Sequence, residues 1–125
     1  MTRTLRAGAF AVGLLLAVSS QAFAHAMLET AVPSAGSTVA AADKIRLSFT
    51  EALEPHFSTI ALAIRDGRDG KPVETPTAAV DPADAKSLVL TLAAPLVPGK
   101  YHVAWSVVSV DTHKTQGSFD FTVKP

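Results

Sequence analysis

Short runs of alternating apolar and polar residues recur along most of the chain. Successive side chains on a β-strand point to opposite faces, so such alternation predicts strands that bury one face. The runs, some of them rich in β-branched residues, cover residues 45–49, 59–64, 87–92, 101–110 and 118–123. No window of helical length has a convincing apolar stripe at the 3.6-residue period. Residues 78–85 favour at most one short helical turn, which two aspartates and a proline interrupt.

Turn-forming residues stand between these runs. Glycine supplies positive φ angles and proline a fixed φ, and both are typical of chain reversals. They occur in the motifs PSAG at residues 33–36, Asp66-Gly67, Asp69-Gly70, Asp81-Pro82 and Pro98-Gly99. Several short strands separated by turns, within about 100 residues, predict an all-β domain built as an antiparallel sandwich or a small Greek-key barrel.

The run at residues 101–110 is followed by two polar residues whose side chains can coordinate a metal. One face of this run is bulkier, and we expect it to lie in the core together with Trp105. The same parity continues to Asp111 and His113, so both side chains should emerge at the rim of the sandwich. His102 has the opposite parity and should face away from them. Because aspartate is an ordinary turn residue and loop histidines are often solvated, this stretch alone does not establish a site.

The first 24 residues have the features of an export signal. Two arginines precede an apolar stretch at residues 7–18, and Ala22-Phe23-Ala24 matches the small-x-small pattern that signal peptidases cut. The apolar stretch is short for a membrane span, although a retained N-terminal anchor is the alternative. Cleavage after Ala24 would remove residues 1–24 and leave a domain of residues 25–125 that begins with His25.

Charge and cysteine content narrow the functional classes. The full chain has 11 basic and 11 acidic residues; without Arg3 and Arg6 the exported domain has 9 basic residues and a net charge of 9 − 11 = −2. This balance offers no basic footprint for nucleic acid or anionic lipid. The chain has no cysteine, which excludes disulfides and thiolate ligands. A metal would therefore depend on histidine, carboxylate, methionine or the amino terminus.

An amino-terminal histidine can chelate a metal in a way that an internal histidine cannot. Its α-amine and ring Nδ1 close a six-membered ring around one ion, and the amine, with an ordinary pKa of about 7.7 to 8, is readily deprotonated. His25, His113 and Asp111 would together supply three nitrogens and one oxygen. Cu(II) prefers such a tetragonal set, whereas Zn(II), the second choice, would take the same atoms in a tetrahedron. The sequence has no cysteine and no methionine cluster, so it lacks the soft sulfur ligands that Cu(I) prefers.

The predicted domain carries a series of short motifs from His25 to Val123. They are the initial His25, PSAG at 33–36, IRLSFTE at 45–51, PLVPGKY at 95–101, WSVVSVDTH at 105–113, and Gly117, Phe119, Phe121 and Val123. Each motif is weak by itself. In this order and spacing they are specific, and the domain resembles the CopC-type periplasmic copper-resistance proteins.

The resemblance implies an immunoglobulin- or cupredoxin-like antiparallel β-sandwich of about seven Greek-key strands that binds one Cu(II) ion. It places the metal ligands on His25 (amine and imidazole), Asp111 and His113. Glu51 corresponds to a carboxylate beside the site that can accept a hydrogen bond from the terminal amine. Some family members also have a methionine-rich loop with a histidine that suits Cu(I). The corresponding residues 65–77 (RDGRDGKPVETPT) contain neither Met nor His, so no Cu(I) site is expected.

Met27 and His56 are two further residues of types that bind copper. In an extended chain Met27 lies on the same side as His25 and could approach the copper, but we expect it to be packed or exposed. His56 follows a proline in a loop-like stretch, and we expect it at the surface without a ligand role.

The predicted function is that of a soluble periplasmic copper carrier or buffer in copper homeostasis and resistance, not of an enzyme. We expect a monomer that exchanges copper with a partner, and the resemblance implies an inner-membrane copper permease as that partner. One alternative is a copper-dependent oxidative enzyme that uses the amino-terminal histidine, which would need open coordination positions and a substrate surface. The other is an interaction sandwich that binds no metal, whose thermal stability Cu(II) would leave unchanged.

Overall fold

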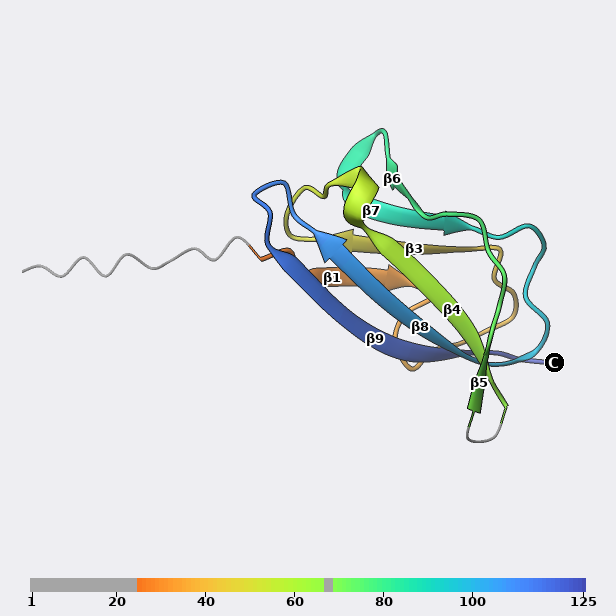
Figure 1. The fold of residues 1–125 in the computed structure, drawn as a ribbon. Helices are drawn as coiled ribbons and strands as arrows, with labels where there is room; N and C mark the ends of the chain where they lie inside the picture. The colour runs from red at the N-terminus through yellow and green to blue at the C-terminus, as the bar shows by residue number, and fades with distance from the viewer. Residues whose placement is uncertain (1–24, 67–68) are drawn as a thin grey trace, which may run out of the picture.

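Two β-sheets lie face to face in residues 25–66 and 69–125, the part of the chain that the computed structural model describes (Figure 1). One sheet has the strand order β1-β3-β7-β6 and the other β2-β9-β8-β4-β5. The elements are β1 (Leu28–Val32), β2 (Thr38–Val39), β3 (Lys44–Phe49), η1 (Pro55–Phe57), β4 (Thr59–Asp66), β5 (Asp69–Pro72), β6 (Ala79–Asp81), β7 (Asp84–Thr91), β8 (Gly99–Val108) and β9 (Lys114–Val123). Within these described ranges no helix is long and apolar enough to cross a membrane.

The predicted all-β sandwich is confirmed, and the five predicted strands correspond to β3, β4, β7, β8 and β9. The chain changes sheet at β1–β2, β2–β3, β3–β4, β5–β6 and β7–β8, and such crossings between layers are typical of Greek-key sandwiches. Nine strands occur in the described residues, whereas the resemblance implied about seven. The alternation missed β1, β2, β5 and β6, because these strands are short. β2 pairs parallel with β9 over two residues, so the sandwich is not wholly antiparallel. The predicted export signal, residues 1–24, lies outside the described residues.

Residues 78–85 contain a β-hairpin turn, and the short helical turn considered for them is wrong. β6 and β7 pair antiparallel, with Asp81 opposite Asp84. Asp81 Oδ1 accepts a hydrogen bond from the Ala83 N–H at 2.9 Å, and Asp84 Oδ1 accepts one from the Lys86 N–H at 3.1 Å. Such local bonding by aspartate side chains favours turns and competes with helix formation.

Arg46 of β3 joins both aspartates of this turn. Its Nη1 lies 2.9 Å from Asp81 Oδ2, and its Nη2 lies 3.5 Å from Asp84 Oδ2. The pKa of Asp81 is lowered from 3.8 by the hydrogen bond from the Ala83 N–H and next by that from Arg46. The pKa of Asp84 is lowered first by the hydrogen bond from the Ser87 hydroxyl. Both carboxylates are therefore stabilised in their ionised form.

Acid should weaken the fold through these carboxylates. A carboxyl group whose folded pKa lies below its unfolded value adds stability above the unfolded pKa and loses it as the pH falls through the folded pKa. We therefore expect the urea midpoint to decline as the pH drops below 3.8, the ordinary value of both groups. Asp81→Asn should make this decline smaller. Urea denaturation of both proteins between about pH 6 and about pH 2 tests this, and equal declines would contradict it.

The core is formed by side chains that point inward from the strands, at every second residue. In β3, Ile45, Leu47 and Phe49 are at most 1% exposed, whereas the intervening Arg46 and Ser48 are only half-buried. Burial of each such large apolar side chain contributes about 1.5–3 kcal/mol. The same alternation in the other long strands adds Leu62, Leu88, Leu90, Tyr101, Val103, Val107, Phe121 and Val123 to the core.

Trp105 packs against the core but is only half-buried, which differs from the expectation of a core residue. Its ring meets that of Phe49 edge to face, with centroids 5.1 Å apart and an interplanar angle of 72°. Gly117 is its partner on β9. A Cβ atom at residue 117 would lie 2.5 Å from Trp105 Cζ2. The indole therefore occupies the space that a side chain at this position would need.

Gly117→Ala should destabilise the protein by about 1–3 kcal/mol, because the added methyl would force the packed indole to shift. For a domain of this size, each kcal/mol lowers the melting temperature by about 4–8 °C. Thermal unfolding followed by circular dichroism measures the effect, and tryptophan emission should change with it. Ser118→Ala, at the next and exposed position of β9, is the control and should stay within about 0.5 kcal/mol. Equal stability of the two variants would contradict this account of Trp105.

Candidate metal centre

The predicted ligands Asp111 and His113 lie in the loop of residues 109–113, which joins β8 to β9 at the end of the sandwich where β1 begins (Figure 1). The Ser109 N–H donates to the His113 carbonyl at 2.9 Å, and the Thr112 N–H donates to the Ser109 carbonyl at 2.8 Å. Thr112 has a positive φ of 74°. The expected rim position is therefore found, but the two side chains project from a tight loop and not from a strand that continues to residue 110.

Asp111 and His113 contact each other within this loop. Asp111 Oδ2 lies 3.2 Å from His113 Nδ1, and the two side chains are 37% and 54% exposed. The buried Ser109 hydroxyl donates to the other carboxylate oxygen, Asp111 Oδ1. This hydrogen bond is the largest cause that lowers the pKa of Asp111 from 3.8, and the contact with His113 lowers the pKa further. The carboxylate is thus held ionised, with one oxygen toward the imidazole.

His25 reaches the same place from the beginning of the domain. Its ring centroid lies 5.0 Å from that of His113, with an interplanar angle of 75°. Ala26, the next residue, is fully buried in the core, whereas the Met27 side chain is exposed. His25 is half-buried, and its Nδ1 atom is shielded from solvent. The fold therefore brings together two imidazoles that are far apart in the sequence.

Hydrogen bonds from both sheets fix the backbone around Ala26. Thr50, directly after β3, accepts the Met27 N–H at 2.9 Å through Oγ1, and the same hydroxyl lies 3.4 Å from the His25 carbonyl. Thr115 Oγ1, on β9, donates to the Ala26 carbonyl at 2.8 Å. Nothing in the sequence marks these two threonines, because their partners are 23 to 25 and 89 residues away.

The side chains gathered here offer donors that suit a divalent transition metal. His25 and His113 bring imidazole nitrogens and Asp111 brings a carboxylate oxygen, which are ligands for Cu(II) and Zn(II). No group of three His, Asp or Glu side chains within residues 25–66 and 69–125 is arranged closely enough to hold a metal unaided. One further donor, the α-amine of His25, would exist only after cleavage in front of that residue. The donor types therefore fit Cu(II) once that amine is included.

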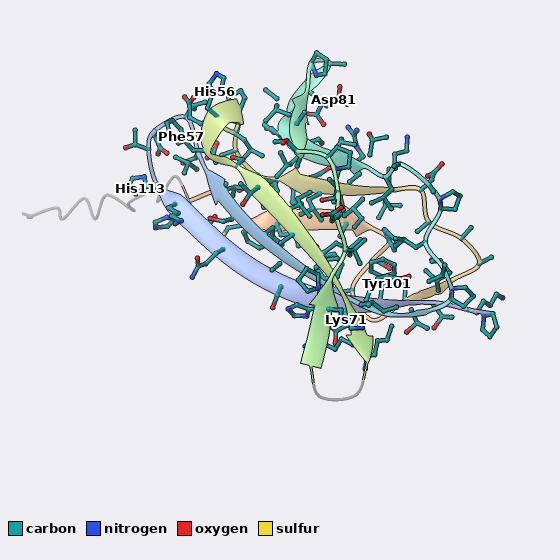
Figure 2. The ribbon with its side chains drawn as sticks, turned by 45° about the vertical axis from the view of Figure 1, so that its right-hand side comes forward. His56, Phe57, Lys71, Asp81, Tyr101 and His113 are labelled. Carbon is teal, nitrogen blue, oxygen red and sulfur yellow. The ribbon has the colours of Figure 1, made fainter. Side chains whose placement is uncertain are left out.

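Glu51, Met27 and His56 are the other residues that the sequence analysis considered for this site. Glu51 follows Thr50 and is half-buried. Met27 is exposed, as is His56 on η1. Figure 2 shows His56 and His113 at the same end of the sandwich, on different elements. Met27 and His56 therefore have the exposed positions expected of them.

His102 lies on the outer face of the five-stranded sheet. Its neighbours Tyr101 and Val103 are buried, so its side chain points away from the core, as the parity of the strand predicts. His102 Nδ1 lies 2.6 Å from Asp120 Oδ1, and Arg65 Nε lies 3.6 Å from the same oxygen. The guanidinium beside this pair disfavours a second cation there.

The domain matches one family over nearly its whole length. A family model described as the CopC domain matches residues 28–124. Copper resistance protein C from Escherichia coli is 43% identical over 116 residues, which cover 90% of this chain and 91% of that protein. The crystal structure of PcoC, a methionine rich copper resistance protein from Escherichia coli, aligns with a TM-score of 0.74 and 42% identity over 81% of this chain and 100% of that one.

The fold is shared with a second solved relative. CopC from Methylosinus trichosporium OB3b aligns with a TM-score of 0.72 and 31% identity, over 81% of this chain and 95% of that one. The family model covers β1 to β9 together with the loop that carries Asp111 and His113. The chain belongs to the CopC domain family.

Proposed function

We propose that the exported protein binds one Cu(II) ion at this end of the sandwich and acts in the periplasm as a copper carrier or buffer in copper homeostasis and resistance. Two of its relatives, Copper resistance protein C and PcoC from Escherichia coli, are copper resistance proteins by name. The observation on this chain that carries the proposal is the approach of His25 to His113, with ring centroids 5.0 Å apart. Two imidazoles beside an ionised carboxylate are a set of donors that Cu(II) favours.

The amine and the imidazole of His25 would chelate the ion, and His113 and Asp111 would complete the set. Glu51, next to Thr50, would accept a hydrogen bond from the amine and orient it. His113 and Asp111 are 54% and 37% exposed, so another protein could approach the bound ion directly. This exposure supports transfer of copper by exchange of ligands.

A carrier fits these residues better than an oxidative enzyme does. With Asp111 as a ligand, one coordination position that oxygen chemistry would need is filled. The chain also has one Trp and one Tyr, of which Tyr101 is buried, so little Trp or Tyr surface is left to form a platform for a carbohydrate substrate. We propose a monomer that delivers copper to, or withholds it from, an inner-membrane copper permease.

The content of methionine supports Cu(II) over Cu(I). PcoC is described as methionine rich. This chain has 2 methionines, and Met1 precedes the predicted cleavage site. Met27 is then the single thioether of the exported domain, and one thioether does not make a soft site for Cu(I).

Adding Cu(II) to the exported protein should raise its melting temperature. A ligand at 100 times its Kd that binds only the folded state adds about 2.7 kcal/mol, which is about 10–20 °C for a domain of this size. Acidification should reduce the rise, because protons compete with the metal for imidazoles and amine. Calorimetry with and without Cu(II) at two pH values measures both effects. An unchanged melting temperature would contradict copper binding, and oxygen consumption in the presence of a reductant would contradict a pure carrier.

A further inference from the structure

The proposed site uses the first residue of the exported chain. Terminal residues of a domain are ordinarily the least ordered, because few contacts hold them. A disordered terminus would lose conformational freedom when it binds metal, and this loss would weaken binding. The amino terminus of this protein therefore needs contacts that hold it before the metal arrives, and residues 25–27 have such contacts.

Thr50 holds the segment from the four-stranded sheet. A hydroxyl can accept one hydrogen bond while it donates another. Thr50 Oγ1 accepts the Met27 N–H at 2.9 Å and donates toward the His25 carbonyl at 3.4 Å, so it bridges backbone groups on both sides of Ala26. The Thr50 N–H also donates to the Met27 carbonyl at 2.9 Å.

Thr115 holds the same segment from the five-stranded sheet. It pairs with the buried Val107, so both side chains lie on the inward face of that sheet. Its hydroxyl donates to the carbonyl of the fully buried Ala26 at 2.8 Å. The first residues of the domain are thus held between two layers that the fold brings together.

We infer that Thr50 and Thr115 are positioning residues, which hold residues 25–27 so that His25 faces His113 before the metal binds. The inference rests on the copper function proposed above. Neither hydroxyl is a ligand, and both act through the backbone of the segment. A purely structural role would instead affect the stability of the sandwich and leave the release of copper unchanged.

Thr50→Val and Thr115→Val remove the hydroxyl and keep the shape of the side chain. In protein expressed with residues 1–24 and purified after export, we expect each variant to bind Cu(II) about fivefold more weakly, the effect of one hydrogen bond. Release of copper to a chelator should be faster by a similar factor. Thr50→Ser and Thr115→Ser restore the hydroxyl and should return both quantities to within about twofold of the wild type. Thr122→Val, also half-buried on β9, is the matched control and should change neither.

Measurements without metal separate this inference from the copper function. Thr50→Val should speed hydrogen exchange of the Met27 amide, and both valine variants should weaken the nuclear Overhauser effect between the rings of His25 and His113. If both valine variants release copper and exchange the hydrogen of the Met27 amide at wild-type rates, the inference is wrong, while the copper function is unaffected. A wild-type protein that binds no Cu(II) would refute the copper function, and a ring-to-ring signal that persists in both variants would then overturn the positioning role as well.

Discussion

Four extra residues, Gly-Ser-Gly-Ser, inserted between Ala24 and His25 should weaken Cu(II) binding by about 100-fold or more, or about 2.7 kcal/mol. The insertion turns the α-amine of His25 into a peptide nitrogen, which keeps its proton at neutral pH and no longer donates to the metal. The six-membered chelate is lost, while the ring of His25 can remain 5.0 Å from that of His113. Competitive titration of both exported proteins with Cu(II) measures the difference.

The length of this insertion matters. An insertion of one or two residues would place a new amine and its amides next to the imidazole, and such a peptide can itself chelate Cu(II). Four residues move the new amine out of that arrangement. The same tetrapeptide added after Pro125 is the control and should leave binding unchanged. If mass spectrometry shows that the parent protein starts at His25 and both extended forms bind equally well, the proposed amine ligand is wrong.

His113→Ala is expected to have the second largest effect, a loss of about 100-fold in Cu(II) affinity. It removes an imidazole nitrogen and also the ring that lies 3.2 Å from Asp111 Oδ2. Because the side chain is 54% exposed, the fold should tolerate the change, and the melting temperature without metal should move little. Competitive titration and thermal unfolding of the metal-free protein measure the two quantities.

His56→Ala and His102→Ala are the matched controls for this variant. His56 is exposed on η1, at the same end as His113 but on another element (Figure 2). His102 lies on the outer face of the sheet beside Asp120. Both variants should bind Cu(II) like the wild type. A greater loss in His56→Ala than in His113→Ala would mean that the wrong imidazole had been assigned to the metal.

The local sequence patterns predicted the longer strands of the fold. β3 and β8 show clear alternation because one face of each is buried over several residues. β6 was not predicted, since it has three residues, the last of which is Asp81, and Pro82 follows it; both residue types favour helix starts as well as turns. The two residues of β2 become a strand only by pairing with β9, and no local pattern can reveal such a pairing.

The candidate site was predictable in its residue types and in its general position. Asp111 and His113 were assigned to the rim because they follow a strand. His25 became a candidate ligand because cleavage after Ala24 would make it the amino-terminal residue. Their neighbours were not predictable. Ser109 was not singled out in the sequence, although its hydroxyl donates to the carboxylate of Asp111.

Composition, alternation and turn residues were enough to establish an all-β sandwich without cysteine, with histidine and aspartate as the candidate ligands. They were also enough to place His102 on the opposite face. These features are local, because a few neighbouring residues set the conformation of a strand or a turn.

The packing of the two sheets determined the contacts between residues that are distant in the sequence. It set the 5.0 Å approach of His25 to His113, the half-burial of Trp105 over Gly117, and the contact of Thr115 with a carbonyl 89 residues away. Each of these depends on which surfaces meet when the core closes. Burial of apolar side chains drives that closure without regard to their separation in the chain, so contacts between distant residues have no counterpart in any local pattern.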